Sequence, residues 1–193
     1  GPIAEQLVAS VRAAGGIWSL QDLAEYAVVE RAPVVTEYRG TRVVAGSSPS
    51  SGGVVIAQAL GMLAEFDLAA LSGADRRHLI IEALRRGYRD RAEYLGDPDF
   101  VDIPREALLD PTYLARRADT IEITRATSSR DLPPLPMPAS ASGGEDTTHF
   151  SVLDADGNRV AATMSINTSF GSGQMPAGTG VVLNNEMDDF AAR

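Results

Sequence analysis

Two adjacent threonines, Thr147 and Thr148, begin the part of the sequence that is richest in groups able to do chemistry. A threonine hydroxyl is a weak nucleophile unless a base lies beside it, and the chain offers few bases. A cut in the backbone before Thr147 would create one, because a free α-amino group has a pKa near 8 and would sit on the same residue as the hydroxyl. The two threonines also fit the ordinary start of a β-strand, where threonine is common.

A second polar group recurs at every second position, at Thr163, Ser165 and Asn167. Side chains alternate between the two faces of a β-strand, so an extended chain would place all three on one face. Two hydroxyls and an amide on one face could orient a nucleophile and bind a substrate. The same pattern fits the solvated face of an antiparallel sheet, and the residues alone leave both interpretations open.

A third polar segment, residues 184–189, reads NNEMDD and holds three carboxylates and two amides within six residues. If enclosed, it would suit an ammonium group, because a buried charge needs an opposite partner. It lacks the ligand spacing of an EF-hand calcium loop. Charged residues are mostly exposed, so a solvated acidic loop is the competing interpretation.

The chain has only two histidines, His78 and His149, which lie far apart in the sequence, so we expect no metal site. His149 follows Thr147 by two residues. Side chains at that spacing along a strand are roughly 6–7 Å apart, too far for a direct hydrogen bond, and we interpret His149 as structural. We expect His78 to be solvated on the polar side of a helix.

Composition excludes several functional classes. A net charge of −9 argues against nucleic-acid binding, which needs a basic face. All 17 basic residues are arginines, which removes Schiff-base and P-loop lysines, and the lack of cysteine removes thiol nucleophiles and disulfides. No apolar run approaches the roughly 18 residues of a membrane helix. The opening GPIAEQL lacks a methionine and a signal core, so we expect an internal piece of a longer precursor.

Hydrophobic periodicity and turn signals predict a mixture of helices and β-strands. Helices are predicted at 2–14, at 20–26 after the capping pair Ser19 and Asp22, at 54–65, at 74–94 and from 111 onward, where Asp110-Pro111 marks a helix start. Strands are predicted at 34–38 and 41–45 on either side of an Arg39-Gly40 turn, and at 148–154 and 159–166 on either side of a turn at 155–158. A short buried strand is predicted at 181–183.

Two of these segments carry more specific expectations. The helix at 74–94 is predicted to bury one apolar face and to expose its arginines on the other. That apolar face consists of Leu79, Ile80, Ala83, Leu84 and Tyr88. Residues 123–146, with four prolines and a run of small residues, are predicted to form a mobile linker.

Three sequence motifs resemble the γ-glutamyltransferase (γ-glutamyl transpeptidase) family of the N-terminal-nucleophile hydrolase superfamily: TTHFSVLDADGN, SIN followed by FGSG, and TGVVLNNEMDDF. The upstream YRG and SSPSSGG stretches resemble the last part of that family's large subunit. The resemblance implies an α+β fold, a four-layer αββα sandwich, of which the chain is a partial domain. Residues 1–146 would be the C-terminal part of a large-subunit-like region, and residues 147–193 the N-terminal part of a small-subunit-like catalytic region.

The resemblance also implies a reaction. The precursor would cut itself between Asp146 and Thr147, and the two subunits would remain together as a heterodimer. Thr147 would then attack the γ-amide of a donor such as glutathione, and the γ-glutamyl group would pass to water or to an amino acid or peptide. No cofactor is expected, and members of the family are usually periplasmic or secreted.

Site residues carry over by motif. Ser165 would orient the nucleophile, where the family often has threonine, and Thr163 would be a partner of the nucleophile. Asn167, Glu186 and Asp189 would hold the substrate's α-ammonium and neighbouring groups. The family's carboxylate-binding arginine, its serine pair and its oxyanion-hole glycines would lie outside this chain, so we expect the chain alone to be an incomplete enzyme.

Two alternatives remain at this point. One is a related acylase for another amide, such as a cephalosporin side chain or poly-γ-glutamate. The other is an uncleaved, non-catalytic fragment with a structural or binding role. The sequence leaves open the acceptor preference, the balance of hydrolysis and transfer, the compartment and the oligomeric state.

Overall fold

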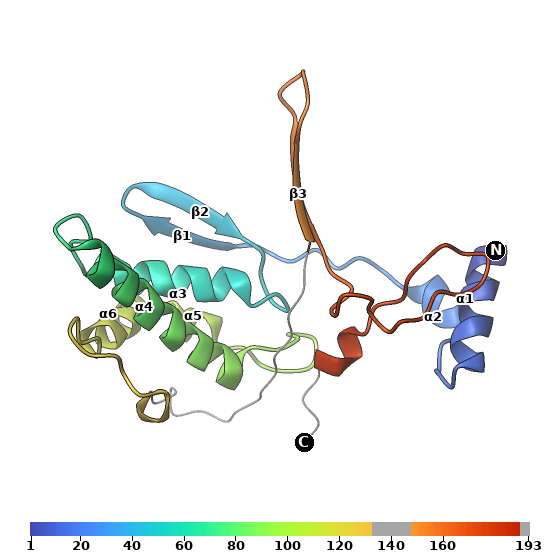
Figure 1. Cartoon of the computed structure of the whole chain (residues 1–193), viewed down its shortest axis with the longest axis horizontal. Coiled ribbons are helices and arrows are strands. Elements are labelled where there is room, and N and C mark those ends of the chain that lie inside the picture. Colours follow the sequence, from blue (N-terminus) through green and yellow to red (C-terminus); the bar gives the residue numbers. More distant parts are fainter. Residues whose placement is uncertain (133–147, 190–193) are drawn as a thin grey trace. The chain divides into compact units, whose positions relative to one another are not determined.

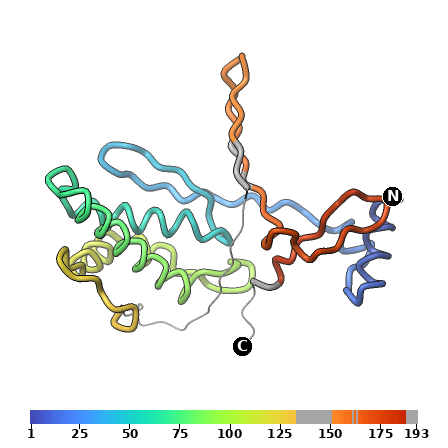
Figure 2. Tube along the Cα trace, viewed as in Figure 1, coloured from blue at the N-terminus to red at the C-terminus, as the bar shows by residue number. Residues whose placement is uncertain are grey.

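The computed structural model describes residues 1–132 and 148–189 of the 193-residue chain, and these fall into two compact units (Figure 1). Residues 30–132 are the described part of a helical unit, and residues 1–29 with 148–189 are the described part of a second unit. Figure 2 follows the same path as a tube along the chain. The two units are defined by packing, whereas the predicted boundary at 146/147 is the peptide bond that would be cut. That boundary stays a prediction.

The helical unit begins with a β-hairpin of β1 (Val34–Tyr38) and β2 (Thr41–Ala45), as the sequence predicts. The strands pair from Val34 opposite Ala45 to Tyr38 opposite Thr41. The two-residue turn has positive φ at both positions, 50° at Arg39 and 78° at Gly40. That geometry matches the right-handed twist of the flanking strands, so the turn fixes the register of the hairpin.

Four helices and a 3-10 turn follow in the described part of this unit. They are α3 (Gly52–Ala64), α4 (Gly73–Tyr94), α5 (Arg105–Leu108), α6 (Pro111–Asp119) and η1 (Ser129–Asp131). Side-chain caps confirm two of the starts: Ser72 Oγ accepts from Asp75 N at 3.1 Å, and Asp110 Oδ1 accepts from Tyr113 N at 3.0 Å. The short α5 is absent from the sequence prediction.

The hydrophobic core of the unit lies where α3 packs on α4 and α6. Val54, Met62, Leu79, Ala83 and Ala118 are among its most deeply buried members. The buried face of α3 is nearly continuous, because alanines and branched residues occupy most of its positions. Such a helix is stable only when neighbours cover most of its surface.

The predicted buried face of α4 is wrong in part. Ile80 and Tyr88 are 37% and 57% exposed, although Leu79 and Ala83 are buried as expected. Their places on the buried face are taken by charged residues, as the next subsection describes. The prediction used only the spacing of hydrophobic residues. It therefore could not identify charged residues of α4 that are buried because they form hydrogen bonds and ion pairs inside the protein.

The second unit contains α1 (Pro2–Ala13), α2 (Leu20–Glu25), β3 (Thr148–Leu153), β4 (Arg159–Met164) and the 3-10 turn η2 (Glu186–Asp189). The predicted capping pair of α2 is confirmed as a reciprocal capping box between Ser19 and Asp22. Strands β3 and β4 are antiparallel, with Thr148 opposite Met164 and Leu153 opposite Arg159.

A turn over residues 154–158 joins β3 and β4, as its sequence predicts. Asp154 Oδ1 accepts from the backbone N–H of Asp156 and of Asn158, both at 2.9 Å, and Gly157 adopts φ 85°. Hydrogen bonds from Asn158 lower the pKa of Asp154, which keeps this carboxylate charged in the turn.

The prediction of a buried strand at 181–183 is wrong. Val181 and Val182 are exposed, and the segment forms no strand. Leu183 instead joins a loop: its N–H donates to Gln174 O at 2.9 Å, and its carbonyl accepts from Ser172 N at 2.9 Å. The neighbouring Gly180 has φ 66°, a left-handed conformation that interrupts an extended backbone.

The predicted mobile linker, residues 123–146, is described only as far as Leu132. That first part contains η1 and contacts α4, whereas residues 133–146 lie outside the described residues. None of the helices within 1–132 and 148–189 is both long enough and apolar enough to cross a membrane.

Candidate functional site

The strongest candidate site is the turn that follows β4, where the SIN motif lies. Asn167 has φ 70° and is only 5% exposed. Its backbone N–H donates to Ser165 Oγ at 2.9 Å, and its side-chain Nδ2 donates to Asn185 O at 3.1 Å. Asparagine tolerates this left-handed conformation better than most residues, and the two hydrogen bonds hold it there.

Asn185 joins this turn to the acidic segment. Its side-chain Oδ1 accepts from Thr168 N and from Thr168 Oγ1, each at 3.1 Å, and its N–H donates to Ile166 O at 3.3 Å. Residues 18 apart in the chain, Asn167 and Asn185, therefore meet through side-chain and backbone contacts. The sequence marked the acidic segment but missed the role of Asn185, for which the only signal was the paired asparagines.

A glycine permits the close approach of these two segments. Gly171 has φ 54°, and its N–H donates to Thr168 O at 2.8 Å. A Cβ at this position would collide with the carbonyl oxygen of Leu183. The FGSG stretch thus needs a glycine at 171 both for its backbone conformation and for the space beside Leu183.

The structure brings together some of the predicted site residues. Ser165 and Asn167 are hydrogen-bonded to each other, and the half-buried Glu186 follows Asn185 directly, with its N–H donating to Asn184 Oδ1 at 3.0 Å. Asp189 closes η2. The side chain of Asp189 lies outside the described atoms.

The predicted single strand face of Thr163, Ser165 and Asn167 is wrong. β4 ends at Met164, two residues earlier than predicted, so the two-residue alternation stops before Ser165. Ser165 and Asn167 meet through a turn instead. Thr163 lies in β4 opposite His149, and the side chains of both are outside the described atoms, while Asp146 and Thr147 are outside the described residues.

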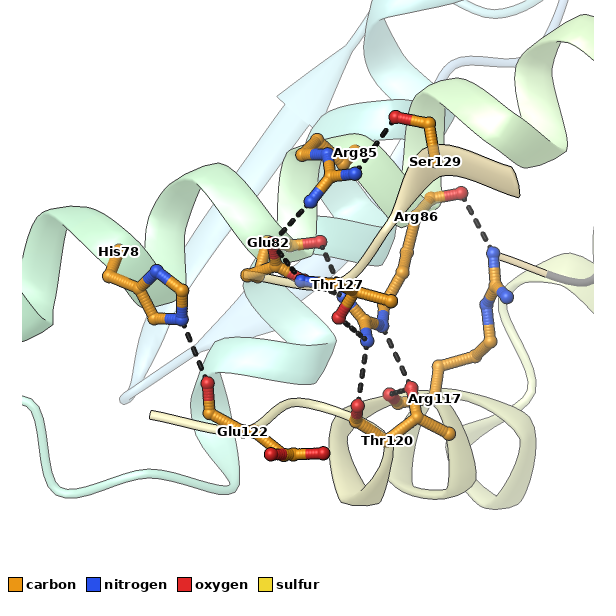
Figure 3. Close-up of polar contacts among 9 residues, drawn as sticks. All are labelled: His78, Glu82, Arg85, Arg86, Arg117, Thr120, Glu122, Thr127 and Ser129. Atoms are coloured by element: carbon orange, nitrogen blue, oxygen red, sulfur yellow. Dashed lines mark hydrogen bonds and ion pairs between the residues drawn. The ribbon is translucent and has the colours of Figure 1, made fainter. Parts of the chain in front are cut away.

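The expectation that His78 is simply solvated is also wrong. It is half-buried, and its Nε2 donates to the backbone carbonyl of Glu122 at 2.8 Å (Figure 3). This contact ties α4 to the segment that follows α6. No cluster of three or more histidines, aspartates or glutamates occurs within 1–132 and 148–189 that could hold a metal ion.

A buried charged pair on α4 was missed by the sequence analysis. Glu82 and Arg86 are 1% and 0% exposed, and Arg86 Nη1 donates to Glu82 Oε2 at 2.7 Å. Burial alone would raise the pKa of Glu82, but hydrogen bonds from Thr127, Arg86 and Arg85 outweigh it and lower the pKa to about 2. The spacing of four residues on one helix was the available signal.

A second buried carboxylate, Asp90, lies two turns further along α4. It accepts from Tyr113 Oη at 2.7 Å, from Gln58 Nε2 at 2.9 Å and from Arg117 Nη2 at 2.9 Å. Burial raises the pKa of Asp90, although Arg117, Tyr113 and Gln58 each oppose this. The two carboxylates on one helix thus have pKa values shifted in opposite directions.

The whole chain, residues 1–193, matches the protein family described as Gamma-glutamyltranspeptidase. The glutathione hydrolase proenzyme of Escherichia coli (strain K12) is 43% identical over 195 residues, which cover 100% of this chain and 33% of that protein. The crystal structure of Helicobacter pylori gamma-glutamyltranspeptidase has a TM-score of 0.67 at 38% identity, over 69% of this chain and 39% of that one.

A cephalosporin acylase from Bacillus halodurans is similar over more of the chain but at lower identity. Its TM-score is 0.81 at 27% identity, over 99% of this chain and 33% of that one. Both described units of the chain contain helices and strands. The chain spans about a third of the length of the curated relative described above, 33%.

Proposed function

Because this chain belongs to the gamma-glutamyltranspeptidase family, we propose that it forms part of an enzyme that transfers or hydrolyses γ-glutamyl groups. Glutathione is the expected donor, since the similar protein from E. coli is named a glutathione hydrolase. The acceptor would be water, an amino acid or a peptide. The match of all 193 residues to the family is the observation that carries the proposal.

The first step of the proposed mechanism is self-cleavage between Asp146 and Thr147. The Thr147 hydroxyl adds to the carbonyl carbon of Asp146, the peptide C–N bond breaks, and the acyl group moves from nitrogen to oxygen. The nitrogen takes up the hydroxyl proton and becomes the α-amine of Thr147. Water then hydrolyses the ester, which restores the hydroxyl and leaves a carboxyl group on Asp146. The name proenzyme of the E. coli relative supports this step.

The second step uses the new terminus. The α-amine, with an ordinary pKa near 8, takes the proton of the Thr147 hydroxyl as the oxygen attacks the γ-amide carbonyl of the donor. The donor's amine leaves with that proton, and a γ-glutamyl ester remains on Thr147. Attack by the acceptor on this ester releases the product and returns the hydroxyl.

Ser165 is the proposed orienting group for this hydroxyl, and Thr163 is its proposed neighbour. The register of β3 and β4 pairs Thr148 with Met164. Thr148 directly follows Thr147 and Met164 directly precedes Ser165, which supports the assignment. Serine retains the hydroxyl that the role requires.

Asn167, Glu186 and Asp189 are the proposed substrate-binding residues. The contact of Asn167 with Asn185 brings the SIN turn beside the residue that precedes Glu186. An amide and a half-buried carboxylate beside one another suit an α-ammonium group, because carboxylates form strong charge-assisted hydrogen bonds with it. Asp189 would add a second negative charge.

The remaining architecture follows from the family. We propose that the described units contribute to a four-layer αββα sandwich that spans the junction of a large and a small subunit. Residues 1–146 would belong to the large subunit and residues 147–193 to the small subunit of a heterodimer. A periplasmic or secreted location rests on the family alone.

An acylase function is the second candidate, and the similarity to cephalosporin acylase favours it. The acidic segment weighs against a glutaryl substrate, which lacks the α-ammonium group that Glu186 and Asp189 would bind. Competition between glutamyl and glutaryl amides would distinguish the two functions. Preferential turnover of the glutaryl amide would favour the acylase.

The decisive test is Thr147→Ala in the parent protein that contains this chain. We expect mass spectrometry of the wild type to show a new N-terminus that begins TTHF, and the variant to remain uncleaved and without activity on γ-glutamyl anilides. Ser169→Ala, a hydroxyl removed from the loop after the SIN motif, is the matched control and should be cleaved. Equal turnover of the anilide by Thr147→Ala would overturn the mechanism.

A further inference from the structure

Residues 120–132, which follow α6, lie along one side of α4, and Figure 3 shows their contacts as far as Ser129. His78 contacts Glu122, Glu82 contacts Thr127, Arg85 contacts Ser129 and Arg89 contacts Leu132. In these four contacts, the residue numbers of α4 and of the segment increase in the same order, so the segment runs parallel to the helix. Its attachment is therefore distributed over about three turns of α4.

Arg86 is the centre of this attachment. Its Nε and Nη2 donate to Thr120 Oγ1 at 2.9 Å and Thr120 O at 2.8 Å, and Nη2 also donates to Thr127 Oγ1 at 3.2 Å. Its other Nη binds Glu82. Most N–H donors of this fully buried guanidinium thus form hydrogen bonds with the segment. Only the planar, forked group of arginine can reach all of these acceptors at once.

Apolar groups close both ends of the contact. Ile121 and Leu132 are buried, and the Leu132 carbonyl accepts from Arg89 Nε at 3.3 Å. Glu82 in turn accepts from Thr127 N at 3.3 Å. Release of the segment would leave Arg86 and Glu82 buried with fewer partners, which is costly, so the pair and the segment hold each other in place.

We infer that Arg86 is a positioning residue for self-cleavage: it fixes the point on α4 from which the chain continues toward Asp146–Thr147. This inference rests on the proposed cleavage. With the segment attached, Asp146 lies 14 positions after the last anchored residue, Leu132; with the segment released, it lies 26 positions after Thr120. Closing the longer chain is roughly 2–3-fold less favourable from length alone.

The test is the cleavage rate of the parent protein with Arg86→Lys, which keeps the positive charge beside Glu82 but loses the fork. We expect cleavage to slow by up to about 2–3-fold, because that is the loop-closure effect of full release of the segment. We also expect faster hydrogen exchange of amides 121–132. Thr127→Val removes one acceptor of Arg86 from the segment side and should change both readouts in the same direction, by less.

Tyr113→Phe is the matched control, because it removes a hydrogen bond to the buried Asp90 of the same helix and leaves the contacts of Arg86 in place. All variants are compared well below their midpoints of unfolding. The inference is overturned if Arg86→Lys cleaves at the wild-type rate, if exchange of 121–132 is unchanged, or if Tyr113→Phe slows cleavage equally. Cleavage in Thr147→Ala would instead overturn the proposed function.

Discussion

The two units use polar side chains in opposite ways. In the helical unit, Glu82, Arg86 and Asp90 of α4 are buried and bound to protein partners. In the second unit, Ser165 is exposed and Glu186 half-buried, and a tight turn holds Asn167 beside them. Buried polar groups fix the path of the chain in the first unit, whereas Ser165 and Glu186 of the second unit remain at least partly exposed to solvent.

The largest effect is expected where a buried charge loses its partner. Arg86→Met leaves the Glu82 carboxylate buried, and breaking such a pair costs about 3–5 kcal/mol of unfolding free energy. Urea denaturation of the chain at neutral pH measures this. Arg125→Met is the control, because its partner Glu122 is exposed and a solvent-screened pair should contribute little to stability. Similar losses in both variants would remove the distinction between buried and exposed pairs.

The pH dependence of stability sharpens the comparison within α4. The pKa of Glu82 is lowered from 4.5 to about 2 in the folded state, so its stabilisation is present above pH 4.5 and is lost as pH falls toward 2. The shift corresponds to about 3 kcal/mol. Asp90 has the opposite effect, because its pKa is raised in the folded state. Its charged carboxylate destabilises the fold at pH values above that pKa, and this destabilisation disappears as the pH falls and the carboxylate takes up a proton.

Urea denaturation from pH 7 to pH 2 checks this, with Glu82→Gln and Asp90→Asn beside the wild type. We expect Glu82→Gln to flatten the fall in stability below pH 4.5 and Asp90→Asn to steepen the overall fall. A pH profile of Glu82→Gln that runs parallel to the wild type would contradict the lowered pKa.

In the second unit, Gly171→Ala tests whether the site depends on close backbone approach. The variant forces an L-residue into positive φ, which costs about 1–2 kcal/mol, and adds a collision with the Leu183 carbonyl. Gly173→Ala is the matched control, because Gly173 has φ 69° but open space around a Cβ. Urea denaturation should show the larger loss in Gly171→Ala, and equal losses would mean that the collision is relieved without cost.

The smallest expected effect belongs to Ser165. Ser165→Ala removes the acceptor of the Asn167 N–H and should cost about 1 kcal/mol in the same assay. Ser165→Thr keeps the hydroxyl and should retain this stability. If Ser165→Thr loses as much as Ser165→Ala, the hydrogen bond is not what holds the turn.

Local signals explain what the sequence predicted well. The Arg39-Gly40 turn, the Ser19–Asp22 capping box and the Asp110-Pro111 helix start depend on neighbours in the chain, so the residue types suffice to find them. The hairpin of β3 and β4 is also found, with strand ends that differ by one or two residues.

Errors arise where distant residues decide the structure. The buried face of α4 depends on acceptors from Thr120 and Thr127, which no helical periodicity contains. The Asn167 turn depends on Asn185, whereas the two-residue pattern treated the segment as a strand that simply continues. The motifs nevertheless pointed to the right family, because recognising them needs only the residue types and their order and not the local backbone.

Gly87 has a consequence for the span between α3 and α4. A Cβ there would lie 3.2 Å from Val55 Cγ1, so the bare backbone allows the helices their present separation. One turn away, the Gln58 amide crosses that separation to reach Asp90 at 2.9 Å. A methyl group at position 87 would push the two helices apart. The side chain of Gln58 is too short to keep its hydrogen bond to Asp90 across a wider separation. The lack of a Cβ atom at Gly87 thus allows the hydrogen bond that joins α3 to α4.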